Sequence, residues 1–278
     1  MVRPLSQLRR LVHEGSSDAP GRIFDVLGRV GLVGYGVVHL LVAWLALRVA
    51  IGLPGGAADA QGAVGTLART PFGVVALALA AVGLIAFSVW QLTAAAVGFG
   101  WVGGGERLRK RAGAAAKAIA TAALAGIVLD YLTGRGAASG DPGARRLTAD
   151  VLALPGGRLL LAAAALGILA LAAAMTYTGV RRTFLGDLDL RRLGPAMRRA
   201  VEVTGAVGHL ARAVALAVIG LLAGAAALFG DPRRAGGLDA ALRALGETGP
   251  GSALLVVVAT GFAAYGVFCV ADAATRRA

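Results

Sequence analysis

The stretch GLVGYGVVHLLVAW, residues 31–44, decides the fold, because it is almost wholly apolar and its pattern returns twice along the chain. The segments GAAAKAIATAALAG from Gly113 and GHLARAVALAVIGL from Gly208 align with it without gaps. A surface helix of a soluble protein shows a broad polar face, which these segments almost lack. The pattern therefore indicates helices whose solvent is lipid.

The composition supports a membrane protein over a soluble one. Of the 278 residues, 57% are hydrophobic and only 15% are charged, whereas a soluble domain averages about 25% charged residues. A helix needs roughly 20 apolar residues to cross the hydrocarbon layer. Six segments meet this requirement: 30–51, 73–97, 112–133, 158–178, 205–229 and 252–271. The sequence thus predicts an all-α integral membrane protein with six transmembrane helices.

The second, fourth and sixth spans share a pattern of their own. Each holds two glycines ten residues apart, and a proline lies at or just before its start. The glycine pairs are Gly73 and Gly83, Gly157 and Gly167, and Gly251 and Gly261, and the prolines are Pro71, Pro155 and Pro250. Together with the aligned odd spans, this pattern predicts three two-helix repeats that form one membrane domain.

We place these repeats at residues 23–99, 106–180 and 198–274, after a cytoplasmic tail at 1–22. Repeats with an even number of spans all face the same way. We therefore expect three parallel repeats related by a pseudo-threefold axis along the membrane normal. Close approach of such helices is favoured by small residues, so we predict packing roles for the paired glycines and for Gly220 and Gly224.

At these motifs the chain resembles a family of bacterial membrane proteins catalogued as domain of unknown function 1206. The motifs that carry the resemblance are GHLARAV at 208–214, PFG at 71–73 and GFAAY at 261–265. The resemblance covers about residues 25–275 and implies a two-helix unit used three times, but no activity, substrate or cofactor. The chain departs from the family pattern at Tyr35, where a basic residue is usual, and in the second repeat, which has PGG for PFG.

The charge distribution predicts the orientation. A net charge of +13 would suggest nucleic acid in a soluble protein, but a basic groove pattern with interleaved aromatic residues is missing. Of the 28 lysines and arginines, 17 flank the spans on one side and eight on the other. By the positive-inside rule, both termini are expected in the cytoplasm, with the chain in a bacterial cytoplasmic membrane. The expected partner is the lipid bilayer, and no nucleic acid is expected.

Four charged residues within or next to the spans are candidate sites. Lys117 and Arg212 share the fifth position of the aligned odd spans with Tyr35. They are either interfacial anchors or a site for the headgroup of an anionic lipid. Arg48 and Asp130 also occupy equivalent positions, so we predict an ion pair between the first two repeats, the alternative being that Arg48 extends alone to the outer surface.

The remaining polar residues leave two functions open. His39, Ser88, Gln91 and Thr121 lie within the spans and either hydrogen-bond between helices or line a narrow polar path. No nucleotide-binding, metalloprotease or serine-hydrolase motif is present, and the single cysteine excludes a disulfide within the chain, so we predict no catalytic, cofactor or metal site and no enzymatic activity. The favoured function is a non-enzymatic membrane protein that acts through lipid or protein partners. The alternative is a small-solute or ion transporter or channel with its path along the pseudo-threefold axis.

Overall fold

The computed structural model describes residues 18–53, 57–98, 103–136, 140–191, 193–247 and 251–275, and it is helical throughout these ranges apart from turns and short connections. The predicted tail, residues 1–22, lies largely outside them. Six helices are long and apolar enough to cross a membrane. They are α2 (Asp18–Ala50), α4 (Gly73–Val97), α5 (Gly104–Leu132), α7 (Gly157–Arg181), α8 (Pro195–Phe229) and α10 (Gly251–Thr275). The six predicted spans are confirmed.

Three of the long helices begin well before the predicted apolar segments, and the first of them, α2, begins at Asp18 rather than near residue 30. Helix α5 begins at Gly104 rather than near residue 112, and α8 begins at Pro195 rather than near residue 205. Their first turns contain arginine, lysine, glutamate and alanine, which are good helix formers outside the hydrocarbon layer as well. The apolar segment therefore marks the part of the helix that lipid can surround, and not the ends of the helix.

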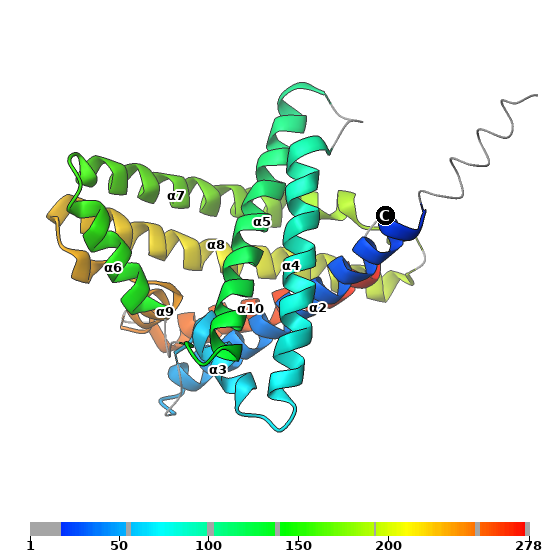
Figure 1. Cartoon of the computed structure of the whole chain (residues 1–278), viewed down its shortest axis with the longest axis horizontal. Coiled ribbons are helices and arrows are strands. Elements are labelled where there is room, and N and C mark those ends of the chain that lie inside the picture. Colours follow the sequence, from blue (N-terminus) through cyan, green and yellow to red (C-terminus); the bar gives the residue numbers. More distant parts are fainter. Residues whose placement is uncertain are drawn as a thin grey trace, which may run out of the picture.

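A short helix joins the two spans of each repeat. These helices are α3 (Ala60–Ala68), α6 (Asp141–Leu152) and α9 (Leu238–Gly246). Two 3-10 turns are also present: η1 (Thr183–Asp187) lies between α7 and α8, and η2 (Pro232–Arg234) lies between α8 and α9. The short helices gather at one end of the molecule, which we call the short-helix end (Figure 1). Each repeat is thus span, short helix, span.

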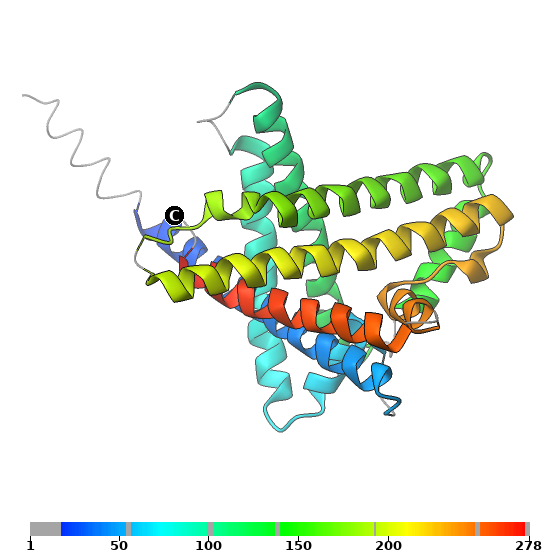
Figure 2. The same cartoon turned by 180° about the vertical axis from the view of Figure 1, so that it is seen from behind.

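The spans pack on one another in the order α7, α8, α10, α2, α4, α5. In both views α7 lies along α8, α2 along α10, and α4 along α5 (Figures 1 and 2). All three interfaces between repeats are present, and so are the interfaces within repeats 1 and 3. In the described part of the chain, no packed interface joins α5 to α7, the two spans of repeat 2. The arrangement is therefore a ring of six helices that is open at one place.

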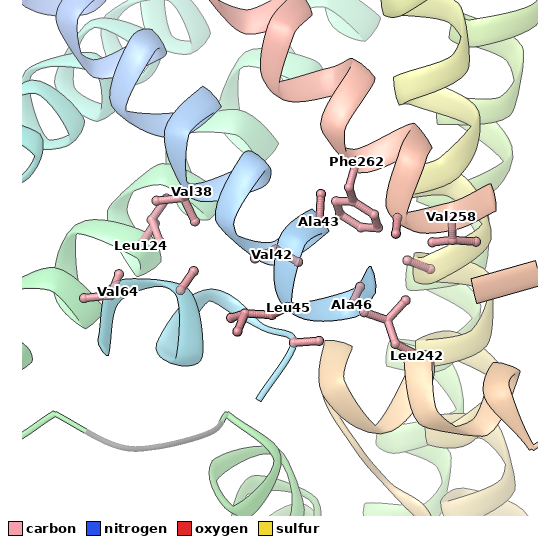
Figure 3. Close-up of a cluster of buried hydrophobic side chains, with 14 of the residues drawn as sticks. Val38, Val42, Ala43, Leu45, Ala46, Val64, Leu124, Leu242, Val258 and Phe262 are labelled. Carbon is pink, nitrogen blue, oxygen red and sulfur yellow. The ribbon is translucent and has the colours of Figure 1, made fainter. Parts of the chain in front are cut away.

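The largest core lies near the short-helix end, where α2 and α10 meet α3, α4, α5 and α9 (Figure 3). Leu45, Val128 and Leu242 are almost completely buried there. A second core contains Phe87, Phe184 and several residues of α10 at the other end of the bundle. Many large apolar side chains are exposed on the outer faces of the spans, as expected for helices that face lipid.

Candidate functional site

A cluster of polar and aromatic side chains lies inside the bundle between α2, α8 and α10. We call it the arginine cluster, and it consists of Tyr35 and His39 from α2, His209 and Arg212 from α8, and Tyr265 from α10. Residues three or four apart lie on the same face of a helix. This spacing directs both residues of α2, and both residues of α8, towards the same interior space.

The guanidinium group of Arg212 is the centre of the cluster. Its Nη2 donates a hydrogen bond of 3.0 Å to the hydroxyl of Tyr35. Its Cζ lies 4.3 Å from the ring centroid of Tyr265, a cation–π contact, and 5.8 Å from that of Tyr35. Among the residues that the structure describes, no carboxylate oxygen is within ion-pair distance of Arg212. The side chain is half-buried, so it points into the bundle and is not a simple surface anchor.

His39 is held as a packed, hydrogen-bonded side chain. It is 8% exposed, and its Nδ1 lies 2.9 Å from the carbonyl oxygen of Tyr35. Because a carbonyl only accepts, Nδ1 carries the proton in this bond. The imidazole also stacks on Phe262, with ring centroids 5.8 Å apart, and touches the ring of Tyr265. These contacts are those of a helix-packing residue.

His209 repeats the same local geometry one helix away. Its Nδ1 lies 2.7 Å from the carbonyl oxygen of Gly205, and its ring stacks on Phe184 with centroids 5.1 Å apart. The charges of Arg212, Lys117 and Asp272 all interact with this imidazole. His209 is therefore exposed to charges from α5 and α10 as well as from its own helix.

Two of the three fifth positions of the odd spans meet in this region. Tyr35 and Arg212, which are equivalent in repeats 1 and 3, are in direct contact. The third equivalent, Lys117, is exposed on α5. The gapless alignment signalled these positions from the sequence, whereas the part played by Tyr265 was not foreseen, because its ring matters only through its place above Arg212.

The other polar residues within the spans lie in a different interface. Ser88 of α4 and Thr121 of α5 are buried, and their hydroxyl oxygens are 2.7 Å apart. Thr121 donates to the carbonyl oxygen of Lys117 at 2.9 Å, so Ser88 is the donor between the two side chains. Gln91 is buried one turn further along α4. This pair connects repeats 1 and 2 and does not meet His39, which contacts α10.

Three buried aspartates stand at the beginnings of the three short helices. Asp59, Asp141 and Asp239 are 4%, 8% and 6% exposed. Asp59 is the N-cap of α3, and its Oδ1 accepts a hydrogen bond of 2.8 Å from the N–H of Gly62. A side-chain oxygen at this position satisfies one of the free N–H groups at a helix start.

The same carboxylates connect the three repeats in a closed cycle. Each accepts a hydrogen bond from a backbone N–H that lies just before the short helix of another repeat. The bonds are Gly140 N–H to Asp59 Oδ2 at 2.7 Å, Gly237 N–H to Asp141 Oδ1 at 2.8 Å, and Ala58 N–H to Asp239 Oδ1 at 2.8 Å. We call these three bonds the aspartate cycle. Sequence reasoning missed it, although one aspartate at the start of each short helix was a visible signal.

Asp239 also forms an ion pair with an arginine side chain. Its Oδ2 accepts a hydrogen bond of 2.9 Å from Nε of Arg243, one turn along α9. This bond raises the pKa of the Arg243 guanidinium above its ordinary value. Both oxygens of Asp239 are therefore used as acceptors of N–H groups.

The predicted ion pair between Arg48 and Asp130 is wrong. Asp130 instead pairs with Arg135 of its own repeat, with Oδ1 and Nε 3.6 Å apart. Arg48 lies half-buried in the last turn of α2. No packed interface joins α2 to α5 in the described chain, so equivalent positions in the alignment do not become neighbours here.

The glycines at the starts of α4, α7 and α10 face the short helices. A Cβ atom added to Gly73, Gly157 or Gly251 would overlap the carbonyl oxygen of Leu67, Val151 or Gly246 respectively. These three glycines let each even span begin directly beside the end of its short helix. In repeat 2 the preceding Gly156 has a φ of 74°, so the PGG departure from PFG supplies a residue that tolerates this left-handed turn.

Of the five glycines inside the spans for which packing was predicted, four contact other helices and one does not. Gly83 lies against Gly31, Gly261 against Ala211, and Gly220 against Leu169, and an added Cβ on Gly224 would lie 3.9 Å from Ala165. An added Cβ on Gly167 would meet no atom within 4 Å. The packing contact predicted at Gly167 is therefore absent from this structure, because α5 does not approach α7.

The fold defines a class of protein: a polytopic helical membrane protein built from three two-helix repeats. The family model for the Domain of Unknown Function DUF1206 matches the chain three times, at residues 30–98, 112–182 and 207–276. The chain belongs to this family. It is also similar to the "Uncharacterized protein YxxB" of Bacillus subtilis (strain 168), with 30% identity over 244 residues that cover 87% of this chain and 88% of that protein. No solved structure matches the chain significantly.

Proposed function

We propose that this chain is a non-enzymatic membrane protein that binds the headgroup of an anionic lipid through Arg212 and Lys117. The observation that carries the proposal is the guanidinium of Arg212, which is half-buried and held by Tyr35 and Tyr265 without a carboxylate partner among the described residues. A cation in the membrane tends to pair with an anion or with polar groups. A lipid phosphate would supply that anion.

The chemistry of arginine suits this role. The guanidinium has five N–H donors in a planar fork that matches the oxygens of a phosphate, and the bond to Tyr35 uses only one of them. The ring of Tyr265 holds the plane of the fork and therefore lowers the entropy that binding would cost. Lys117 is exposed on α5 and adds a second positive charge, which acts on His209 of the cluster.

The contacts of the polar residues support a packed interior more than a transport path. His39 bonds to the backbone of its own helix and is covered by aromatic rings, and Ser88 and Thr121 bond to each other in another interface. In both His39 and His209, Nδ1 is used in a hydrogen bond to a backbone carbonyl oxygen of the same helix, which supports a packing role over a catalytic one. A transport path along the axis would need such groups to face one common channel.

We also propose that the three repeats are related by a pseudo-threefold axis along the membrane normal. The aspartate cycle supports this symmetry, because each repeat gives one carboxylate to the next and receives one N–H in return. The distribution of basic residues supports an orientation with the short-helix end outside and both termini in the cytoplasm of a bacterial cell.

The first test measures lipid binding. The double substitution Lys117→Gln and Arg212→Gln should lower the anionic phospholipid that co-purifies with the protein by about tenfold, since a hydrogen bond to a charged group contributes ~1.5–3 kcal/mol. The bound lipid would be extracted from purified protein and quantified by mass spectrometry. As a matched control, Arg199→Gln removes an exposed cation of α8 and should leave the bound lipid unchanged. Equal lipid in the double variant and the control would contradict the proposal.

The second test measures orientation. A reporter enzyme that is active only in the periplasm should give no signal when it is fused after residue 278, because that end is expected in the cytoplasm. The same reporter fused after Gly236, between α8 and α9, should be active. Strong activity from the fusion at residue 278 would overturn the orientation.

A further inference from the structure

In repeats 1 and 3, which we call closed, the two spans pack against each other through glycines at equivalent positions. In repeat 1, a Cβ added to Gly31 of α2 would overlap the carbonyl oxygen of Gly83 in α4 and lie 3.1 Å from the Cβ of Phe87. In repeat 3, a Cβ added to Gly208 of α8 would lie 2.6 Å from the Cβ of Tyr265 in α10. In both repeats the odd span therefore touches the even span through backbone that only glycine leaves uncovered.

Repeat 2 has the same residues but not the same contact. The equivalents of these glycines are Gly113 in α5 and Gly167 in α7, and an added Cβ on either would meet no atom within 4 Å. Leu171 of α7 is equivalent to the buried Phe87 and Tyr265, yet it is 38% exposed, against 3% and 8%. Repeat 2 therefore has the glycines that would allow α5 and α7 to pack closely, but the two helices do not make this contact in this structure.

The position of repeat 2 suggests how it could close. Its outer partners are in place, since α5 packs along α4 and α7 along α8, and the aspartate cycle holds α6 at the short-helix end. The α4–α5 pair is steeply inclined to the α7–α8 pair in both views (Figures 1 and 2). Helices that cross one bilayer are tilted by about 20° on average. A membrane would therefore draw the two pairs towards a common direction, and α5 towards α7.

We infer that repeat 2 acts as a gate that opens and closes beside the arginine cluster. In its closed state α5 packs on α7 through Gly113 and Gly167. Closure carries Lys117 towards its equivalents Tyr35 and Arg212, which already touch. Two cations repel each other in a medium of low dielectric constant unless an anion lies between them. On this point the inference rests on the proposed function: the anionic headgroup binds in the open state and stabilises the closed one.

Repeat 1 provides the template for a crosslinking test. An added Cβ on Gly34 lies 3.6 Å from the Cβ of Ala80, which is within the range of a disulfide. The equivalent residues of repeat 2 are Ala116 and Ala164. In a Cys269→Ala background, the pair Ala116→Cys and Ala164→Cys should form a disulfide within one chain after mild oxidation.

Lipid composition separates closure from headgroup binding. In vesicles of phosphatidylglycerol the Ala116–Ala164 crosslink should approach the yield of a Gly34→Cys and Ala80→Cys control, and in phosphatidylcholine it should fall severalfold. Adding Lys117→Gln should remove the difference between the two lipids. A second control, Ile119→Cys with Leu166→Cys, joins two outward-facing residues that are 69% and 67% exposed and should not crosslink.

The outcomes are distinct. Absence of the Ala116–Ala164 crosslink in both lipids, while the repeat 1 control forms, would overturn the gate. A crosslink between two chains would also overturn it, because a second copy would then cover this face. Equal crosslinking in both lipids would support the closed state and contradict the headgroup as its cause, and with it the proposed function.

Discussion

Replacement of Asp59 by asparagine is expected to lower the free energy of unfolding by about 3 kcal/mol, because one of two buried charge-assisted hydrogen bonds is lost and the other is weakened to a neutral one. Both carboxylate oxygens accept N–H groups, from Gly62 within α3 and from Gly140 in the next repeat. An asparagine has one acceptor oxygen and one NH₂ group, so one of these donors would face another donor. The measurement is denaturation of the purified protein in detergent, followed by loss of helical circular dichroism.

The control for this prediction is Asp150→Asn. Asp150 lies in α6, near the same end of the molecule, but its side chain is exposed. Its replacement should change stability by less than about 0.5 kcal/mol, the usual range for a surface substitution. If Asp59→Asn were as stable as this control, the aspartate cycle would contribute nothing to holding the repeats together.

Replacement of Gly31 by alanine should cost about 2–3 kcal/mol, since overpacking of a tight contact usually costs ~1–3 kcal/mol. The new methyl group would overlap the carbonyl oxygen of Gly83, which is backbone and cannot rotate away as a side chain can. Helices α2 and α4 would have to move apart, and their other contacts would weaken. The same denaturation measurement applies, together with the fraction of protein that elutes as a monodisperse species.

Gly126→Ala is the matched control, again a glycine in a span. An added Cβ on Gly126 would meet no atom within 4 Å. Its equivalent in repeat 1 is Trp44, which is 55% exposed, so this position faces outward whether repeat 2 is open or closed. Alanine should stabilise the helix there by up to ~1 kcal/mol through its higher helix propensity. Equal effects at Gly31 and Gly126 would contradict close packing between α2 and α4.

The spans and the repeats could be predicted because each depends on local properties of the chain. Whether a segment lies in lipid follows from the transfer free energy of its own residues, which is why all six spans were found. The glycines of α4 and α10 were visible at fixed spacing because close packing needs small residues at regular depths. The starts of α2, α5 and α8 were less well predicted, since charged residues that end an apolar segment do not end a helix.

The ion pair failed for a different reason. Residues at equal positions in the repeat alignment are expected at equal depth in the membrane. The prediction paired Arg48 with Asp130 on this depth alone. Contact also requires that the two helices pack and face each other, and Asp130 instead meets Arg135 of its own repeat. The same limit hid the roles of Tyr265 and of the three aspartates, whose partners lie far away in the sequence.

The sequence by itself determined that this protein lives in a membrane, crosses it six times and uses one two-helix unit three times. These properties follow from hydrophobicity and periodicity, which are sums over neighbouring residues. Only the tertiary structure decided that Arg212 points between two tyrosines, that three aspartates join the repeats in a cycle, and that repeat 2 stands open. These features depend on the rotation of each helix about its axis and on which helices meet, and both are set by the packing of the whole bundle.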